Sequence, residues 1–172
     1  MSKLTEIRKN LVEKGLVKPT YRDAVREFIP KIIENQSIAI TLTFKKHWTR
    51  KNGLMNVDVY LSDEIIKSVW ERFQRKLNKL VWKNQFKNKG KKLSAVAVIE
   101  DGFGLKNKHL HATLGNFPNN FDYCQLTKLI AKASSECLEL DMQQDVKEIQ
   151  NNGWNDYITK EVSSKHSSKV LW

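Results

Sequence analysis

The order of apolar and polar residues in this 172-residue chain switches between the two-residue period of strands and the longer period of amphipathic helices. Strands are predicted over residues 37–44 and 96–99, and a third strand contains the His-Leu-His run at 109–111. One long helix is predicted to begin at Ser62, and a second follows a turn and cap at 119–122. The apolar face of the first helix comprises Ile66, Val69, Trp70, Phe73, Leu77 and Leu80. The apolar face of the second comprises Leu126, Leu129, Ile130, Ala133, Cys137 and Leu140.

The remaining segments have weaker patterns. Residues 3–14 and 20–33 are predicted helices, the second of them kinked or split by Pro30. Residues 54–61 alternate weakly and are predicted to pair back on the first strand. The polar run 144–149 is a poor strand by pattern, and an edge position in the sheet would explain its polarity. A last helix is predicted to close the chain.

These elements predict an α+β fold with a central antiparallel sheet of about five strands. The two long helices should pack on one face of the sheet, and the last helix and a candidate metal site should occupy the other. Residues 1–36 are predicted to form an N-terminal helical extension that braces the sheet or contacts nucleic acid, and bracing is the preferred interpretation. Residues 37–172 are predicted to form the main part of one compact domain.

The charge of the chain points to a polyanionic partner. Its 30 Lys and Arg residues outnumber its 19 Asp and Glu residues, which gives a formal net charge of +11. No acidic residue occurs over 72–99, next to the predicted metal site. Such runs are usually only solvated faces, but one this one-sided is interpreted as a surface that tracks phosphates. Its candidate DNA-binding residues are Lys87, Lys89, Lys91 and Lys92.

A second basic segment follows the first strand and is predicted to be a loop. Its candidate DNA-binding residues are Lys45, Lys46, Trp48 and Arg50. Two aromatic residues lie near the first basic run. Trp82 is assigned to the core, whereas Phe86 either packs there or stacks on bases.

The cysteines and residues 1–35 bear on the cellular compartment of the protein. Cys124 and Cys137 fall within one predicted helix and form no disulfide framework, so a reducing, cytoplasmic compartment is expected. Residues 1–35 are too charged for a signal peptide, and no apolar run is long enough to span a membrane.

A candidate metal site lies around the predicted hairpin at 96–111. Successive strand residues point to opposite faces, so His109 and His111 project together and Leu110 points into the core. Glu100 precedes a Gly-rich turn and, in a hairpin, sits across from His109. Two imidazoles and a carboxylate suit a divalent ion with open coordination positions. The alternative is an ordinary hairpin with two surface histidines.

A second candidate element is Tyr157-Ile158-Thr159-Lys160. At helical spacing Trp154, Ile158 and Val162 form one apolar stripe that would dock on the sheet. Tyr157 and Lys160 are three residues apart and share a face beside that stripe, where a Tyr is placed to react. The alternative is an amphipathic helix with a Tyr at its rim.

Together these segments resemble a known family. His109-Leu110-His111 resembles the His-hydrophobic-His motif of HUH endonucleases, and Tyr157-Ile158-Thr159-Lys160 resembles their Tyr-x-x-Lys motif. More narrowly, the chain is similar to the single-tyrosine replication initiators of rolling-circle plasmids and small circular-DNA viruses. Glu100 matches their acidic metal ligand, and residues 40–44 fit an earlier strand motif loosely. The resemblance covers about residues 37–165.

The resemblance implies a metal-dependent enzyme that nicks and rejoins single-stranded DNA and so initiates rolling-circle replication. Tyr157 would form a covalent 5′-phosphotyrosine intermediate with help from Lys160. Glu100, His109 and His111 would bind Mn²⁺ or Mg²⁺, and residues 37–172 would be the endonuclease domain. The expected partners are a single-stranded or hairpin origin and host replication proteins.

Four alternatives remain open. A single-strand transposase takes its third metal ligand from the Tyr helix, and a conjugative relaxase usually has three clustered His, which this chain lacks. A metal-independent two-histidine phosphoesterase acting on RNA would use His47 and His111, each in a His-x-Thr run, and would leave Tyr157 without a role. A nucleic-acid-binding module without catalysis is favoured only if Tyr157 is buried. No Gly-x-x-x-x-Gly-Lys loop is present, so no helicase motor of that type is expected.

Overall fold

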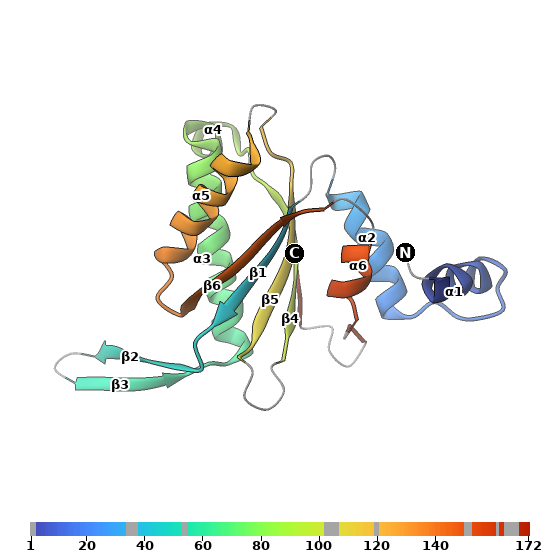
Figure 1. Ribbon diagram of the computed structural model, residues 1–172, viewed down its shortest axis with the longest axis horizontal. Coiled ribbons are helices and arrows are strands. Elements are labelled where there is room, and N and C mark those ends of the chain that lie inside the picture. The colour runs from blue at the N-terminus through green and yellow to red at the C-terminus, as the bar shows by residue number, and fades with distance from the viewer. Residues whose placement is uncertain are drawn as a thin grey trace.

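The computed structural model describes residues 3–33, 38–52, 55–101, 107–118, 121–149, 153–160, 162–163 and 169–172. These residues adopt the predicted α+β fold around a five-stranded sheet with the order β6-β1-β5-β4-β7 (Figure 1). Every neighbouring pair of strands in this sheet is antiparallel. The strands are β1 (Ile38–Phe44), β4 (Ser94–Glu100), β5 (His109–Gly115), β6 (Leu140–Glu148) and β7 (Val170–Leu171).

The register of the central strands places both histidines on one polar track. Thr41 pairs with His111 and Thr43 pairs with His109 across β1 and β5. Glu100 pairs with His109 across β4 and β5, which confirms the expected position of the carboxylate. Directly opposed residues of an antiparallel ladder share a face, so all five side chains project from the same side of the sheet.

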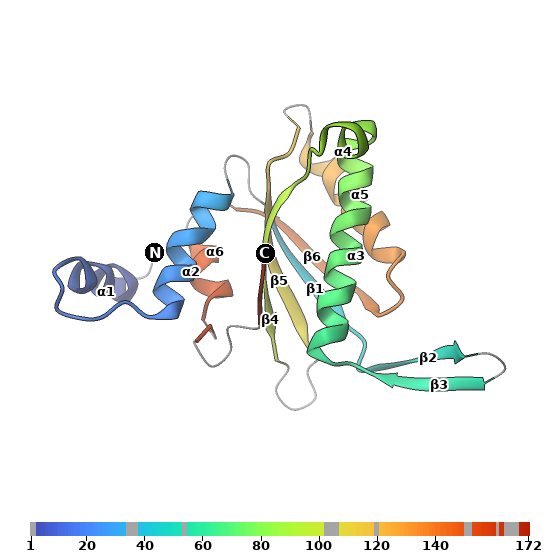
Figure 2. The same cartoon turned by 180° about the vertical axis from the view of Figure 1, so that it is seen from behind.

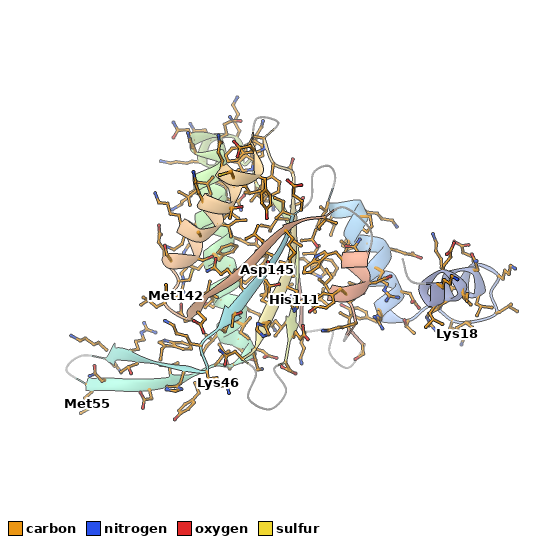
Figure 3. The ribbon with its side chains drawn as sticks, in the orientation of Figure 1. Lys18, Lys46, Met55, His111, Met142 and Asp145 are labelled. Carbon is orange, nitrogen blue, oxygen red and sulfur yellow. The ribbon has the colours of Figure 1, made fainter. Side chains whose placement is uncertain are left out.

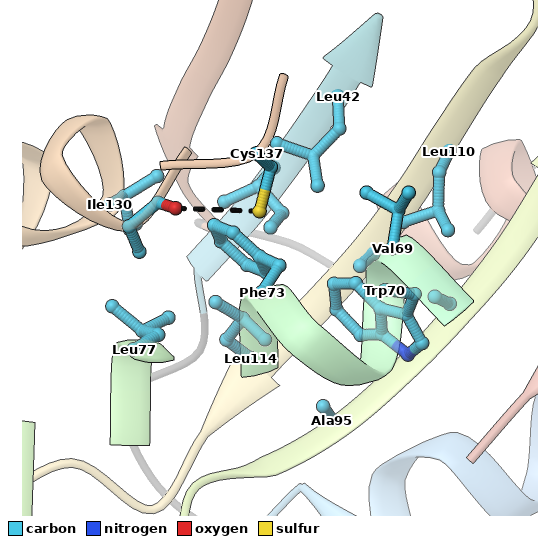
Figure 4. Packing of buried hydrophobic residues seen from close by; sticks show 14 of the residues in the cluster. Leu42, Val69, Trp70, Phe73, Leu77, Ala95, Leu110, Leu114, Ile130 and Cys137 are labelled. Carbon is cyan, nitrogen blue, oxygen red and sulfur yellow. Dashed lines mark hydrogen bonds between the residues drawn. The ribbon is translucent and has the colours of Figure 1, made fainter. Parts of the chain in front are cut away.

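Two long helices cover the other face, as predicted (Figures 1 and 2). They are α3 (Asp63–Trp82) and α5 (Tyr123–Ser135), and the side chains of Ser62 and Asp122 cap their first turns. This layer contains the larger of the two buried apolar clusters among the described residues, and burial of each large side chain contributes about 1.5–3 kcal/mol, so it is the main core. Figure 4 shows its centre, with Leu42, Val69, Trp70, Phe73, Leu77, Leu110, Leu114 and Ile130.

A smaller core lies on the face that carries the histidines. There α2 (Tyr21–Ile32) and α6 (Gly153–Ile158) pack on the sheet, so α2 braces it. α1 (Lys3–Glu13) lies outside α2 and reaches it through an ion pair between Arg8 and Asp23 (Figure 2). The buried residues of this core are Val25, Ile29, Val96, Val98, Ile158, Val162 and Val170.

Residues 47–60 contain a separate hairpin instead of the expected basic loop and sheet strand. β2 (His47–Asn52) pairs with β3 (Met55–Tyr60), and the hairpin projects away from the sheet (Figure 1). The prediction that residues 54–61 pair with the first strand is therefore wrong. The physical reason is that β5 and β6 occupy both edges of β1, so no edge remains for β3.

The second long helix ends earlier than predicted. α5 stops at Ser135, and Cys137 lies in the following turn with its Sγ 3.6 Å from the Ala133 carbonyl oxygen. The two cysteines therefore do not share a helix. Leu140 begins β6 because the chain there pairs with β1. β6 is an outer strand of the sheet, as predicted for residues 144–149.

The C-terminal part also differs from expectation. α6 ends at Ile158, and Val162 is buried beyond the helix instead of continuing its stripe. β7 then joins the sheet beside β4, so the last helix does not close the fold. A short helix, α4 (Asn84–Lys89), follows α3, and α2 runs through Pro30 without splitting.

Some expectations cannot be compared with the structure. The turn glycines at 102–104 and the boundary at 36–37 lie outside the described residues, so both stay predictions. Trp82 is buried as expected, and Phe86 is partly buried against the main core. No helix in the described ranges is long and apolar enough to cross a lipid bilayer.

Candidate functional site

Hydroxyl groups of β1 fix both histidine rings. Thr43 Oγ1 lies 3.1 Å from His109 Nδ1, and Thr41 Oγ1 lies 2.9 Å from His111 Nδ1. Each contact joins residues that the ladder places directly opposite one another. A hydrogen bond at Nδ1 sets the orientation of an imidazole ring and leaves Nε2 as the nitrogen that can bind another group.

Glu100 connects the histidine strand to the segment after α6. Its Oε2 lies 2.5 Å from His111 Nε2, and its Oε1 lies 2.6 Å from Lys160 Nζ. Partial burial would raise the pKa of the Glu100 carboxyl, but hydrogen bonds from Lys160 and His111 outweigh it and keep the pKa below its usual value. Burial lowers the pKa of His111, which Glu100 opposes only in part. At neutral pH the carboxylate is therefore charged and the imidazole neutral.

The tautomer of His111 follows from these contacts. A carboxylate only accepts hydrogen bonds, so His111 Nε2 donates its proton to Glu100 and Nδ1 accepts from the Thr41 hydroxyl. A hydroxyl can also accept, so the ring proton can move to Nδ1 without losing its partner. His111 Nε2 could thus become a metal ligand while Thr41 keeps the ring in place.

Tyr157 lies against this cluster. Its ring meets the His111 ring edge to face with centroids 5.1 Å apart, and it stacks on Trp154 at 5.3 Å. Trp154 is itself held by a hydrogen bond from Nε1 to Thr113 Oγ1 at 3.0 Å. Lys160 Nζ lies 4.4 Å from the centroid of the Tyr157 ring. Tyr157 is 42% exposed, so the condition that favours a module without catalysis is not met.

The buried side of α6 explains why Tyr157 faces the histidines. Ile158 packs in the smaller core, and Thr159 is fully buried and accepts a hydrogen bond from Arg26 Nε at 3.0 Å. Arg26 also pairs with Asp156 at 3.2 Å. These contacts attach one side of α6 to α2. The side that carries Tyr157 therefore faces the histidine strand.

The expected metal ligands share one face but are not gathered around a common point. In the described part of the chain, no three His, Cys, Asp or Glu side chains form a group placed to hold a metal ion. The His109 and His111 rings are 6.2 Å apart, and Glu100 is engaged by Lys160. The donor types, two imidazoles and one carboxylate, nevertheless fit Mn²⁺ or Mg²⁺.

The two basic clusters occupy different places. Lys45, Lys46, Trp48 and Arg50 lie at or on the β2–β3 hairpin, which leaves β1 at the end of the sheet where Thr43 meets His109 (Figure 3). Lys45 Nζ donates to the Leu138 carbonyl at 2.8 Å. The hairpin thus begins beside the candidate site.

The Lys87–Lys92 cluster lies far from that site. Lys87 and Lys89 belong to α4, and Lys91 and Lys92 precede β4. Glu100 is at the far end of β4, whose seven residues span roughly 20 Å. All four lysines are exposed, and Lys91 lies over the Trp82 ring at 5.1 Å. The expectation that this run adjoins the candidate metal site does not match its position.

The two-histidine alternative has no geometric support. His47 is exposed on β2, where its ring lies near that of Tyr60, whereas His111 is buried at the centre of the sheet (Figure 3). No contact among the described residues joins the two histidines.

Sequence reasoning missed the roles of three residues. Thr41 and Thr43 orient the histidine rings, and Thr113 holds Trp154. A signal was present for the first two, because they alternate with apolar residues on a strand at the same spacing as the histidines. Comparisons with protein-family models, with curated proteins and with solved structures found no match, so the function is argued from this site.

Proposed function

We propose that this protein is a metal-dependent enzyme that nicks and rejoins single-stranded DNA and thereby initiates rolling-circle replication. The observation that carries the proposal is the meeting of two segments that are distant in the sequence. An exposed Tyr157 packs on His111, and Lys160 from the same segment pairs with Glu100. A candidate nucleophile, a cation and three candidate metal ligands thus share one face of the sheet.

The proposed reaction is a transfer of a phosphodiester to tyrosine. Tyr157 Oη attacks the scissile phosphorus and gives up its proton to solvent, while the bond from phosphorus to the 3′ oxygen breaks. The DNA is then joined to Tyr157 through its 5′ phosphate, and the 3′ oxygen takes a proton to become a hydroxyl. Because the phosphotyrosine bond keeps the energy of the cleaved linkage, the same step run backwards rejoins the strand.

The other residues of the site have separate proposed roles in this reaction. Lys160 places a positive charge over the Tyr157 ring, where the attacking oxygen and the phosphate both carry negative charge. Glu100, His109 and His111 would hold a divalent ion, which supplies Lewis-acid stabilisation of the phosphate. Thr41 and Thr43 keep the imidazoles oriented.

One observation favours a replication initiator over a single-strand transposase. The carboxylate beside His111 comes from β4, whereas the segment after α6 contributes Lys160. In the transposases the third ligand comes from the Tyr helix, so the present source of the carboxylate is that expected of the initiators.

The decisive experiment is incubation with single-stranded DNA and Mn²⁺, followed by a denaturing gel and mass spectrometry. A covalent adduct on the peptide that contains Tyr157 is expected. Nicking with no adduct, or an adduct on Tyr60 or Tyr123, would overturn the proposal.

A further inference from the structure

A hollow of about 620 Å³ lies between α1, the amino end of α2 and the segment after α6. Three guanidinium groups line it, Arg8 from α1 and Arg22 and Arg26 from α2. Val162 and Ser163 form the wall on the side of α6. Figure 2 shows these helices side by side, on the face of the sheet that carries the histidines.

Two of the three arginines have carboxylate partners. Arg8 pairs with Asp23 at 3.0 Å, and Arg26 pairs with Asp156 at 3.2 Å. Arg22 forms no ion pair within the part of the chain that the structure describes, and one Nη donates a long hydrogen bond of 3.4 Å to the Asp156 carbonyl. Its Nε is buried and has no hydrogen-bond partner among the described residues. Among the described residues, these three cations are therefore matched by two carboxylates, and the charge of Arg22 is the one left uncompensated.

An uncompensated charge in this position is costly. Burial lowers the pKa of Arg22, and the neighbouring Arg26 lowers it further. A partly buried cation without a partner is retained at a cost in stability, which a bound anion would offset. The forked donors of arginine match the oxygens of a phosphate.

We propose that this hollow binds a backbone phosphate of the DNA strand held at Tyr157. The inference rests on the proposed function and adds a second contact point for the same strand. Arg22 donates to the carbonyl of Asp156, which precedes Tyr157, and Arg26 donates to Thr159, which lies between Tyr157 and Lys160. A strand carries a phosphate every few ångströms, so the hollow would take one that neighbours the scissile linkage.

The first test uses inorganic phosphate as the probe and the melting temperature as the readout. Phosphate should raise the melting temperature of the wild type above that in chloride of equal ionic strength. Arg22→Gln should abolish this difference, whereas Arg75→Gln, which removes an exposed charge from α3, should keep it. Without phosphate, Arg22→Gln should melt no lower than the wild type, because the removed charge was uncompensated. A wild type that gains nothing from phosphate would overturn the proposal.

The second test measures binding of a short single-stranded DNA in the Tyr157→Phe background, so that cleavage plays no part. Arg22→Gln should weaken binding about tenfold. It should also reduce the slope of log affinity against log salt by about 0.7. Arg22→Lys keeps the charge without the fork, so it should restore the slope and only part of the affinity.

The outcomes separate this inference from the proposed function. Stabilisation by phosphate with an unchanged DNA slope would show a site for free phosphate and would overturn the assignment to the strand. A second outcome combines a flatter salt dependence of DNA affinity in Arg22→Gln with a wild type that forms no covalent adduct. It would support the phosphate site and overturn the proposed nicking reaction.

Discussion

Lys160 and Glu100 form an ion pair, with Nζ 2.6 Å from Oε1, that joins the tyrosine segment to the histidine strand. The other oxygen of the same carboxylate accepts from His111. Glu100 cannot serve a metal ion fully while it holds Lys160, so metal binding and release of Lys160 should be coupled. Loss of this ion pair should therefore change metal affinity and nicking activity in opposite directions.

Lys160→Met should lower nicking but tighten Mn²⁺ binding. The change frees Glu100 from an ion pair that is partly exposed, so the gain in affinity should be about twofold to fivefold. Calorimetric titration with Mn²⁺ measures it. Lys147→Met is the matched control, because Lys147 is an exposed lysine of β6 paired with Asp145. Weaker Mn²⁺ binding in Lys160→Met would contradict the coupling.

Tyr157→Phe should abolish cleavage and the covalent adduct, because only the attacking oxygen is removed. The ring still stacks on Trp154, so binding of single-stranded DNA should stay within a few fold. Gel and fluorescence assays report the two properties separately. Tyr60→Phe, on the exposed hairpin, should keep both. An adduct that persists in Tyr157→Phe would end the assignment of the nucleophile.

A chelator should block nicking, and Mn²⁺ or Mg²⁺ should restore it. His109→Ala and His111→Ala should be inactive, and Glu100→Ala should bind metal more weakly, because each variant lacks one donor. Activity assays and metal titrations check these effects. Full activity in excess chelator would instead point to the two-histidine phosphoesterase, and His47 and His111 would then be essential.

The two basic clusters allow a paired test of the DNA path. Removing one lysine or arginine that binds a phosphate of a single strand should reduce the slope of log affinity against log salt by about 0.7. Neutralising Lys45, Lys46, Arg50 and Lys51 together, or Lys87, Lys89, Lys91 and Lys92 together, should therefore flatten it by roughly 1 to 3 units.

Sequence choice should survive neutralisation of the second cluster, because the hairpin beside the site is the better candidate for reading bases. Salt titrations on origin and scrambled strands measure both effects. An unchanged slope for the second cluster would show that its lysines are only solvated and that the DNA contacts the candidate site and the β2–β3 hairpin instead.

The contact of α1 with α2 should be sensitive to acid. Burial would raise the pKa of Asp23, but hydrogen bonds from Arg8 and Thr20 outweigh it and hold the pKa at about 2. The ordinary value is about 3.9, so this stabilisation is complete above about pH 5 and is lost as the pH falls toward 2.

Asp23→Asn should therefore lower the free energy of unfolding by about 1 kcal/mol at pH 7, a value that allows for solvent screening. The difference from the wild type should vanish near the folded pKa. Denaturant melts at several pH values provide the measurement, with Asp58→Asn on the hairpin as the control. A constant difference at all pH values would contradict the ion pair.

Much of the candidate site could be predicted from spacing. A strand has a fixed two-residue period, so His109 and His111 had to share a face, and a hairpin then placed Glu100 opposite His109. The exposure of Tyr157 also agrees with its position beside an apolar stripe.

The missed features depend on contacts between distant segments. The separate hairpin follows from the occupation of both edges of β1, which the weak alternation of 54–61 does not reveal. The ion pair of Lys160 depends on how α6 docks against α2. The distance of Lys92 from Glu100 depends on which end of β4 each one flanks, and a charge run carries no such information.

The strand order has a mechanical consequence for a protein joined to DNA. β6 and β7 are the two outer strands of the sheet, and the segment that carries Tyr157 connects them. Among the described residues, β6 has six ladder pairs with β1, whereas β7 has two with β4. A pulling force on a strand attached to Tyr157 would therefore load two anchors of unequal strength. We expect β7 to peel away first, while β6 keeps the tyrosine tethered to the sheet.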